Sequence, residues 1–99
     1  MRKIKELVER IDDELGSAEE YGEKFIEYKA DGENSMAEKF KEMAMQEMNH
    51  ANMMHELAVK EIEKVSAVYN APAEMREKWD KSHTAYVQRA ARIKSMLNM

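Results

Sequence analysis

Apolar residues recur along this chain at alternating steps of three and four residues, in three segments separated by short breaks. This spacing places the apolar side chains on one face of an α-helix. It predicts three helices, at about residues 3–30, 36–68 and 73–97. The chain is also rich in strong helix formers and holds only one proline and three glycines. We therefore expect a single all-α domain over residues 1–99 and exclude a sheet protein.

The two breaks carry the signals that end one helix and begin the next. Gly32, within Asp31-Gly32-Glu33-Asn34, suits the left-handed position just past a helix. Ser35 followed by Glu38 is the pattern of a capping box, which would start the second helix. Pro72, within Asn70-Ala71-Pro72, suits the first position of the third helix. Because the first break is so short, we expect the first two helices to form an antiparallel hairpin.

Ionisable residues interrupt the apolar rows of the first two helices. Glu47 stands between Ala44 and Ala51 in the second row, and His50 lies on the same face of that helix. Counting equal steps from the break places Glu14 level with His50, with Glu47 about one turn away. The three side chains are thus expected to converge. The first row runs through Ile4, Leu7, Ile11, Glu14, Ala18, Tyr21, Phe25 and Tyr28.

Carboxylates in an apolar seam need a compensating partner, since a buried, unpaired carboxylate costs several kcal/mol. A divalent metal is the strongest candidate, because Glu oxygens suit iron or manganese and a neutral imidazole is compatible with both. The pattern therefore favours a metal site at Glu14, Glu47 and His50. The alternative is that both acids are solvated, or paired with basic groups of the third helix such as Arg89 or Arg92.

The segment that holds these residues resembles the metal-binding helical hairpin of the ferritin-like superfamily, and most closely its rubrerythrin branch. That pattern has a Glu, a Tyr seven residues later, a Gly at the turn, a Phe in the second helix and then Glu-x-x-His-Ala. The match covers about two fifths of the chain. It runs without gaps through Glu14, Tyr21, Gly32, Phe40, Ala44, Glu47, His50 and Ala51.

The resemblance implies a di-iron carboxylate centre, with Glu14, Glu47 and His50 as ligands and Glu47 as the bridging one. It also implies a ferroxidase-type oxidoreductase activity, or the reduction of peroxide or oxygen, with manganese or zinc as other metals that the site could take. A full ferritin-like bundle carries a second Glu and a second Glu-x-x-His on two further helices. This chain lacks them, so we expect a homodimer or higher homo-oligomer to complete the four-helix bundle.

A second ligand set is available within one chain. Asp80 and His83 have the spacing of Glu-x-x-His, although with a shorter acid, and their use would leave the metal-loaded protein monomeric. His83 also lies between Trp79 and Tyr86, a pattern more typical of a hydrogen-bonded core histidine. Tyr21 would either support a metal ligand from two turns away or pack in the core. His55 is expected at the surface.

Composition and charge remove several other classes of function. The absence of cysteine excludes disulfides, zinc fingers, iron–sulfur clusters and thiol catalysis. The net charge of −4 argues against nucleic acid as a partner. No apolar run reaches the ~20 residues that a membrane span needs, and a cytoplasmic protein is expected. Residues 1–34 carry 6 basic and 11 acidic side chains, whereas residues 70–99 carry 6 and 3. These segments should attract each other, within or between chains.

Two other functions fit the same pattern. The chain could be a metal-free interaction module, an adaptor that binds a partner through a helix face rich in its ten methionines. A metal could also act as a purely structural staple, without redox chemistry. Most of the methionines are expected to be packing residues.

Overall fold

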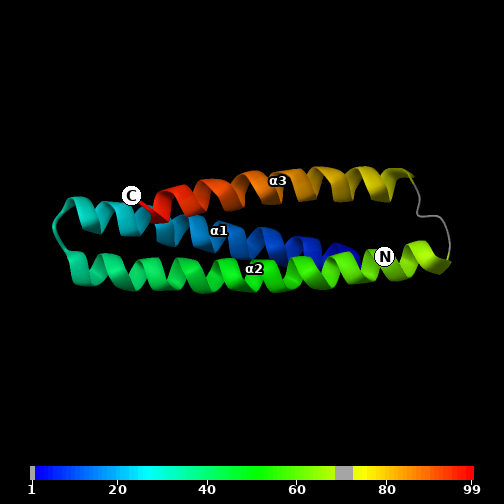
Figure 1. Cartoon of the computed structure of the whole chain (residues 1–99), viewed down its shortest axis with the longest axis horizontal. Coiled ribbons are helices and arrows are strands. Elements are labelled where there is room, and N and C mark those ends of the chain that lie inside the picture. The colour runs from blue at the N-terminus through cyan, green and yellow to red at the C-terminus, as the bar shows by residue number, and fades with distance from the viewer. Residues whose placement is uncertain (1, 69–72) are drawn as a thin grey trace.

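The computed structural model describes residues 2–68 and 73–99, which form three α-helices. Helix α1 spans Arg2–Ala30, α2 spans Asn34–Val68 and α3 spans Ala73–Leu97. The predicted three-helix, all-α chain is confirmed, and α1 and α2 pack as a hairpin (Figure 1). The predicted cap at Pro72 lies outside the described residues. The molecule is a narrow rod of 55 × 17 × 16 Å.

The turn between α1 and α2 is closed by a left-handed glycine, as predicted. Gly32 has a φ of 77°, its N–H donates to Lys29 at 3.1 Å, and the Glu33 N–H donates to Tyr28 at 2.9 Å. These two bonds are the Schellman arrangement. The predicted capping box is wrong, because α2 begins at Asn34, two residues before the predicted start. The Ala37 N–H donates to the Glu33 carbonyl at 3.0 Å, so Ser35 lies inside the helix.

Small residues on α2 allow the two hairpin helices to approach closely. Ala44, Ala51 and Ala58, each seven residues after the last, are fully buried. Larger side chains of α1 fill the space opposite them, and Leu15 is the most buried of these. At the turn end, the rings of Tyr21 and Tyr28 pack on Phe40. The other core residues of α1 and α2 are Ile4, Ile11, Ala18, Phe25, Ala37 and Met48.

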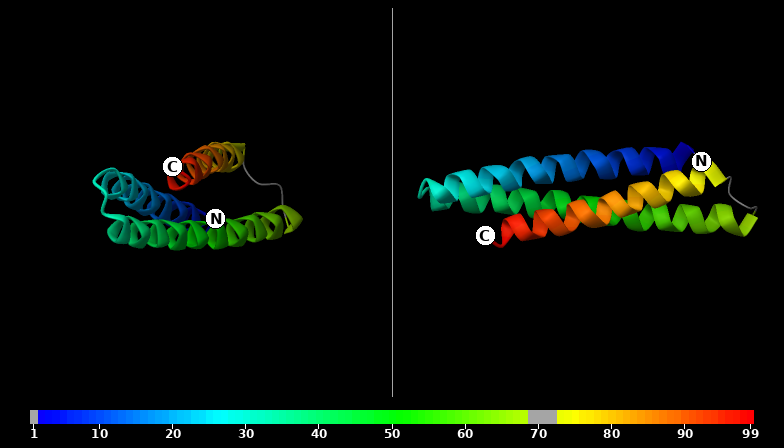
Figure 2. Two further views of the ribbon diagram at one scale, coloured as in Figure 1. Left: turned by 60° about the vertical axis from the view of Figure 1, so that its left-hand side comes forward. Right: turned by 90° about the horizontal axis from the view of Figure 1, so that it is seen from above.

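Helix α3 lies along one side of this hairpin and packs mainly on α1 (Figure 2). A Cβ atom at Gly22 would lie 3.1 Å from Met96 Cε, so the missing side chain gives α3 its close approach. Arg89 Nε donates to Glu19 Oε1 at 2.5 Å, and its Nη1 also binds Asp12. Burial acts to lower the pKa of Arg89, but these two carboxylates outweigh it and raise the pKa. The acidic first segment and basic last segment therefore attract each other within the chain.

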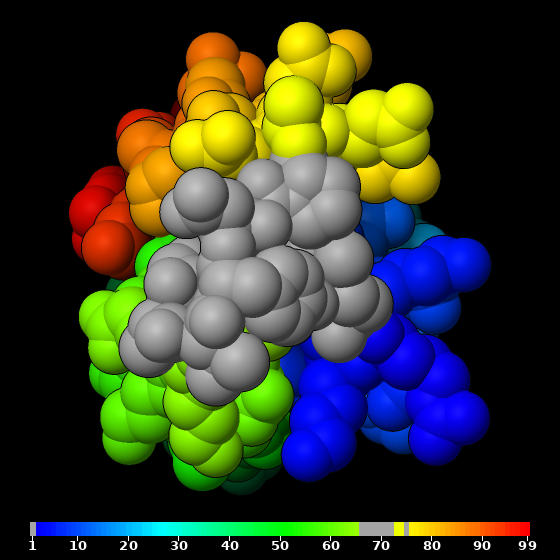
Figure 3. Space-filling model, turned by 90° about the vertical axis from the view of Figure 1, so that its right-hand side faces the viewer, coloured from blue at the N-terminus to red at the C-terminus, as the bar shows by residue number. Residues whose placement is uncertain are grey.

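Helix geometry shows which side of α1 faces away from α3. Asp12, Glu19 and Gly22 contact α3. Residues seven apart point in nearly the same direction, whereas residues two apart differ by about 200°. Glu14 therefore lies on the side of α1 opposite to Asp12 and to α3. Figure 3, which views the rod from one end, shows α1, α2 and α3 at three corners of the cross-section.

The hairpin thus keeps one face that α3 does not cover. On α2, Asn52 is bound by Tyr86 of α3, and His50 lies about 200° round the helix from it. Two rows of residues at seven-residue spacing line this side, and every member is half-buried. We call this surface the open face: Leu7, Glu14, Tyr21 and Tyr28 of α1, with Phe40, Glu47, Met54 and Glu61 of α2.

Among the residues that the structure describes, no helix combines the length and the apolar character that crossing a membrane would require.

Candidate metal centre

Two carboxylates and one imidazole meet at the middle of the open face. His50 Nδ1 lies 3.7 Å from Glu14 Oε2 and 3.8 Å from Glu47 Oε2. One ligand atom from each of the three residues falls within 4.8 Å of the others. The carboxylates are half-buried, and His50 is the exposed member of the group. We call Glu14, Glu47 and His50 the Glu–Glu–His group.

The hairpin register brings this group together. The closed turn at Gly32 fixes how α1 pairs with α2, and equal steps along the helices from that turn reach Glu14 and His50 at the same level. Glu47 is one turn away from His50 on the same helix, as an i, i+3 pair. The sequence-based expectation that these three side chains converge agrees with the geometry.

No lysine or arginine of the described residues forms an ion pair with Glu14 or Glu47. Arg89, which the sequence offered as a partner, instead binds Asp12 and Glu19 on the other side of α1. Two carboxylates that share a site repel each other. Among the described residues, the His50 imidazole is the basic group within ion-pair distance of them.

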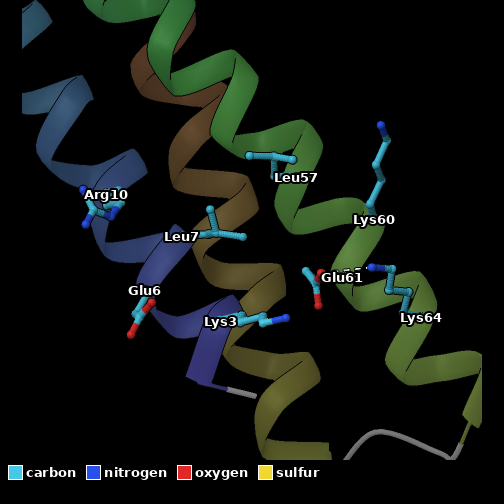
Figure 4. Close-up of a pocket in the computed structure, with 8 residues that line it drawn as sticks. All are labelled: Lys3, Glu6, Leu7, Arg10, Leu57, Lys60, Glu61 and Lys64. Atoms are coloured by element: carbon cyan, nitrogen blue, oxygen red, sulfur yellow. Dashed lines mark hydrogen bonds and ion pairs between the residues drawn. The ribbon is translucent and has the colours of Figure 1, made fainter.

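Glu61 shows how a carboxylate in the same row is compensated elsewhere. It lies fourteen residues after Glu47 on α2, and their side chains are 24% and 23% exposed. Lys64 Nζ is 3.4 Å from Glu61 Oε1. Glu61 is thus half-buried and paired. Figure 4 shows it beside a hollow of about 320 Å³ at the end of the open face. This hollow is lined by Lys3, Glu6, Leu7, Arg10, Leu57, Lys60, Glu61 and Lys64.

The size and chemistry of the Glu–Glu–His group fit a transition-metal ion. Ligand atoms at ~2.1 Å from an ion lie up to about 4 Å apart when they stand on opposite sides of it. The observed spacing of at most 4.8 Å needs only small side-chain rotations to reach that range. Oxygen ligands with one imidazole are typical of iron and manganese sites, and zinc also accepts them.

The other proposed ligands lie elsewhere. Tyr21 packs on Phe40 with a centroid distance of 6.1 Å. Asp80 is exposed, beside Lys81 and Gln88. Neither Asp80 nor His83 joins the Glu–Glu–His group in the described part of the chain.

His83 is hydrogen-bonded to His55. His55 was expected at the surface, but it is half-buried between α2 and α3. Its Nε2 lies 3.0 Å from His83 Nδ1, and its ring stacks on Tyr86 at 4.5 Å and on Trp79 at 5.7 Å. The missed signal is a second stripe on α2, through Met48, Asn52, His55 and Val59, again at steps of three and four. His83 is hydrogen-bonded, as its pattern suggested, but exposed rather than in the core.

Comparison with known proteins adds nothing to this geometry, because no family model, curated protein or solved structure matches the chain.

Proposed function

We propose that this chain is a ferritin-like metal-binding protein, with a di-iron or iron/manganese carboxylate centre at the interface of a homodimer. Glu14, Glu47 and His50 are the ligands that each chain supplies. The observation that carries the proposal is the Glu–Glu–His group itself: two half-buried carboxylates meet one imidazole, and no lysine or arginine of the described residues pairs with them. A bound cation would supply the missing positive charge.

The number of ligands in one chain is half of what a di-iron site needs, which supports a site formed by two chains. A bundle-core di-iron site needs one Glu from each of two helices and a Glu-x-x-His from each of the other two. One hairpin holds half of this set. A two-fold axis through the open face doubles it to four Glu and two His. The four carboxylates would carry about −4, which two divalent cations neutralise.

The apolar members of the open face support the same arrangement. Leu7, Tyr21, Tyr28, Phe40 and Met54 are half-buried rather than buried, since α3 covers the other side of the hairpin. A second hairpin packed here would finish their burial, at roughly 25 cal/mol for each Å² of apolar surface. Helix α3 would then flank the four-helix core.

Each ligand has a distinct chemical part. The Glu14 and Glu47 carboxylates would neutralise the charge of a bound metal, and His50 would offer a neutral nitrogen. Bound iron would supply the electron transfer to oxygen or peroxide, which gives a ferroxidase-type activity.

The experiment that tests the proposal is metal analysis of matched variants. Protein made in iron-rich medium, or reconstituted with Fe(II) without oxygen, should hold about one metal per chain, as the ligand set of one chain implies. Glu47→Gln should lose it. Glu61→Gln is the control, because Glu61 has the same helix, row and exposure and should keep the metal. Equal metal loss in both variants, or a metal-free wild type after reconstitution, would contradict the proposal.

A metal-free interaction module is the second candidate, and exposed apolar side chains on α2 favour it. Met36, Met53 and Leu57 are each about half exposed or more, and adaptable methionine surfaces suit protein binding.

A structural metal is the third candidate. Stopped-flow absorbance of Fe(II) mixed with oxygen distinguishes it, because a staple would bind the metal without oxidising it.

A further inference from the structure

Helix α3 is joined to α2 by a small polar and aromatic cluster. Within the part of the chain that the structure describes, two side-chain hydrogen bonds connect these helices: His55 with His83, and the Tyr86 hydroxyl donating to Asn52 Oδ1. The ring of Trp79 stacks on both histidines, at 5.7 and 5.8 Å. This cluster lies on the side of the hairpin away from the Glu–Glu–His group.

The two imidazoles meet end to end, with one nitrogen facing the other. The ring centroids are 5.1 Å apart, and the nearest nitrogens, His55 Nε2 and His83 Nδ1, are 3.0 Å apart. The centroid distance is close to the sum of this N···N distance and the two ring radii, as expected for rings that meet at their edges. Such a contact is a hydrogen bond through one proton, in which one nitrogen donates and the other accepts. A metal chelate would instead need both lone pairs to converge on a point at an angle. The geometry therefore favours a hydrogen bond between the two rings over a shared metal ion.

The rest of α3 is held by contacts that do not involve these histidines. Ala90, Ile93 and Leu97 are buried, and Arg89 is paired with Glu19 and Asp12 of α1. From Ala73 to His83, the residues whose burial is described are exposed, apart from the half-buried Trp79 and Ser82. Among the described residues of the first half of α3, Trp79 packs on the core and His83 is bonded to His55. This half therefore has fewer anchors than the second half, and the histidine pair is one of them.

We propose that the His55–His83 pair is a proton-operated clasp that fastens the first half of α3 to α2 and opens in acid. The bond exists while at least one ring is neutral. When both rings are protonated, neither nitrogen accepts a hydrogen bond, and two like charges face each other across the interface. The first half of α3 then separates from α2, while Arg89 and the buried end of the helix keep its second half on α1.

The surroundings of His55 set the direction of the response. Burial lowers the pKa of His55 and the charge of His83 lowers it further, while Glu56 acts in the opposite sense. Lys60 and Glu63 share the nearby surface of α2, and Glu9, Asp12 and Arg89 line the hollow beside Tyr86 between α1 and α3. Because the folded pKa lies below the unfolded value of ~6.5, the contribution of the clasp is present above that pH. It is lost as the pH falls through the folded pKa.

The Asn52 bond does not share this response. Burial raises the pKa of the Tyr86 hydroxyl, with a further contribution from Glu56, so the group stays protonated and keeps donating throughout the acid range. Opening of the clasp should therefore loosen the start of α3 without unfolding the protein.

Trp79 is the single tryptophan of the chain and stacks on the pair, so it reports the clasp directly. The test uses metal-free protein in chelator, titrated from pH 8 to pH 5. Trp79 emission should change with a midpoint below pH 6.5. Amide exchange over residues 76–84, corrected for its intrinsic pH dependence, should speed up about tenfold, as expected for loss of one hydrogen bond.

Matched variants assign the transition. His83 is exposed, so His83→Gln should fold normally, and it should remove both the Trp79 transition and the acid-induced exchange. His50→Gln changes the remaining histidine and should leave both responses intact. A transition that persists in His83→Gln, or wild-type exchange that does not change between pH 8 and pH 5, would overturn the proposal. Neither result bears on metal binding, because the Glu–Glu–His group is not involved.

Discussion

At the scale of single residues, the most informative comparison is between the surroundings of Glu47 and those of Glu61. Both lie in the same row of α2 and are nearly equally exposed, but Glu61 has Lys64 as a partner, whereas Glu47 faces Glu14 and His50. A carboxylate in an apolar seam that is not matched by a nearby cation weakens the folded state. A bound metal ion would offset this cost. Glu47 is therefore the proposed ligand whose replacement is most informative.

Replacing Glu47 by leucine should separate stability from metal binding. Glu47→Leu removes an acid from the apolar seam. Without metal, the free energy of unfolding should therefore stay the same or rise by less than about 1 kcal/mol. With metal at a hundred times its dissociation constant, the wild type should gain ~2.7 kcal/mol, and the variant nothing. Calorimetry with and without Mn(II) measures both effects. A metal-dependent rise that survives in Glu47→Leu would count against the site.

The Glu–Glu–His group could be predicted from the sequence because each step depended on local rules. The turn at Gly32 is short, so the helix register follows, and the register puts Glu14 level with His50. The His55–His83 bond could not be predicted in this way. It depends on how α3 is rotated against α2, which a single apolar row for each helix does not determine.

At the scale of elements, the turn between α1 and α2 controls the register on which the site depends. Gly32→Ala should destabilise the protein by about 1 kcal/mol, because an alanine at a φ of 77° is strained. Gly16→Ala is the matched control. It is helical, and its Cβ would meet only Arg89 Nη2 at 3.8 Å, so it should stabilise by up to about 1 kcal/mol. Urea unfolding measures both, and destabilisation by both variants would show that this account of the turn is wrong.

The packing of α3 was only partly predictable. A single apolar row for each helix identified residues of the α1–α2 seam, among them Ala44 and Ala51. It did not include Leu15, Gly22 and Met48, which are buried and lie beside that seam. A helix in a three-helix arrangement has two neighbours and needs a wider apolar stripe than one row describes. The attraction between α1 and α3 was foreseen from charge, but its individual partners were not.

At the scale of the whole molecule, the open face and the half set of ligands point to the same assembly. The face carries half-buried apolar side chains along both helices, with two neighbouring carboxylates at its centre. Without metal, a two-fold dimer would crowd four acids together, and their repulsion would oppose association. With metal, the same acids would instead act as ligands shared between the two chains of the proposed dimer. Dimer formation and metal binding should therefore be one coupled equilibrium.

Light scattering of the purified protein, with Mn(II) or anaerobic Fe(II) and then with chelator, tests this coupling most directly. We expect twice the mass of one chain with metal bound and a shift toward the monomer after chelation, with the dimer restored when metal is added back. His83→Ala should behave like the wild type, since Asp80 and His83 lie outside the Glu–Glu–His group. A metal-loaded monomer that loses its metal on His83→Ala would contradict the dimer and place the site within one chain.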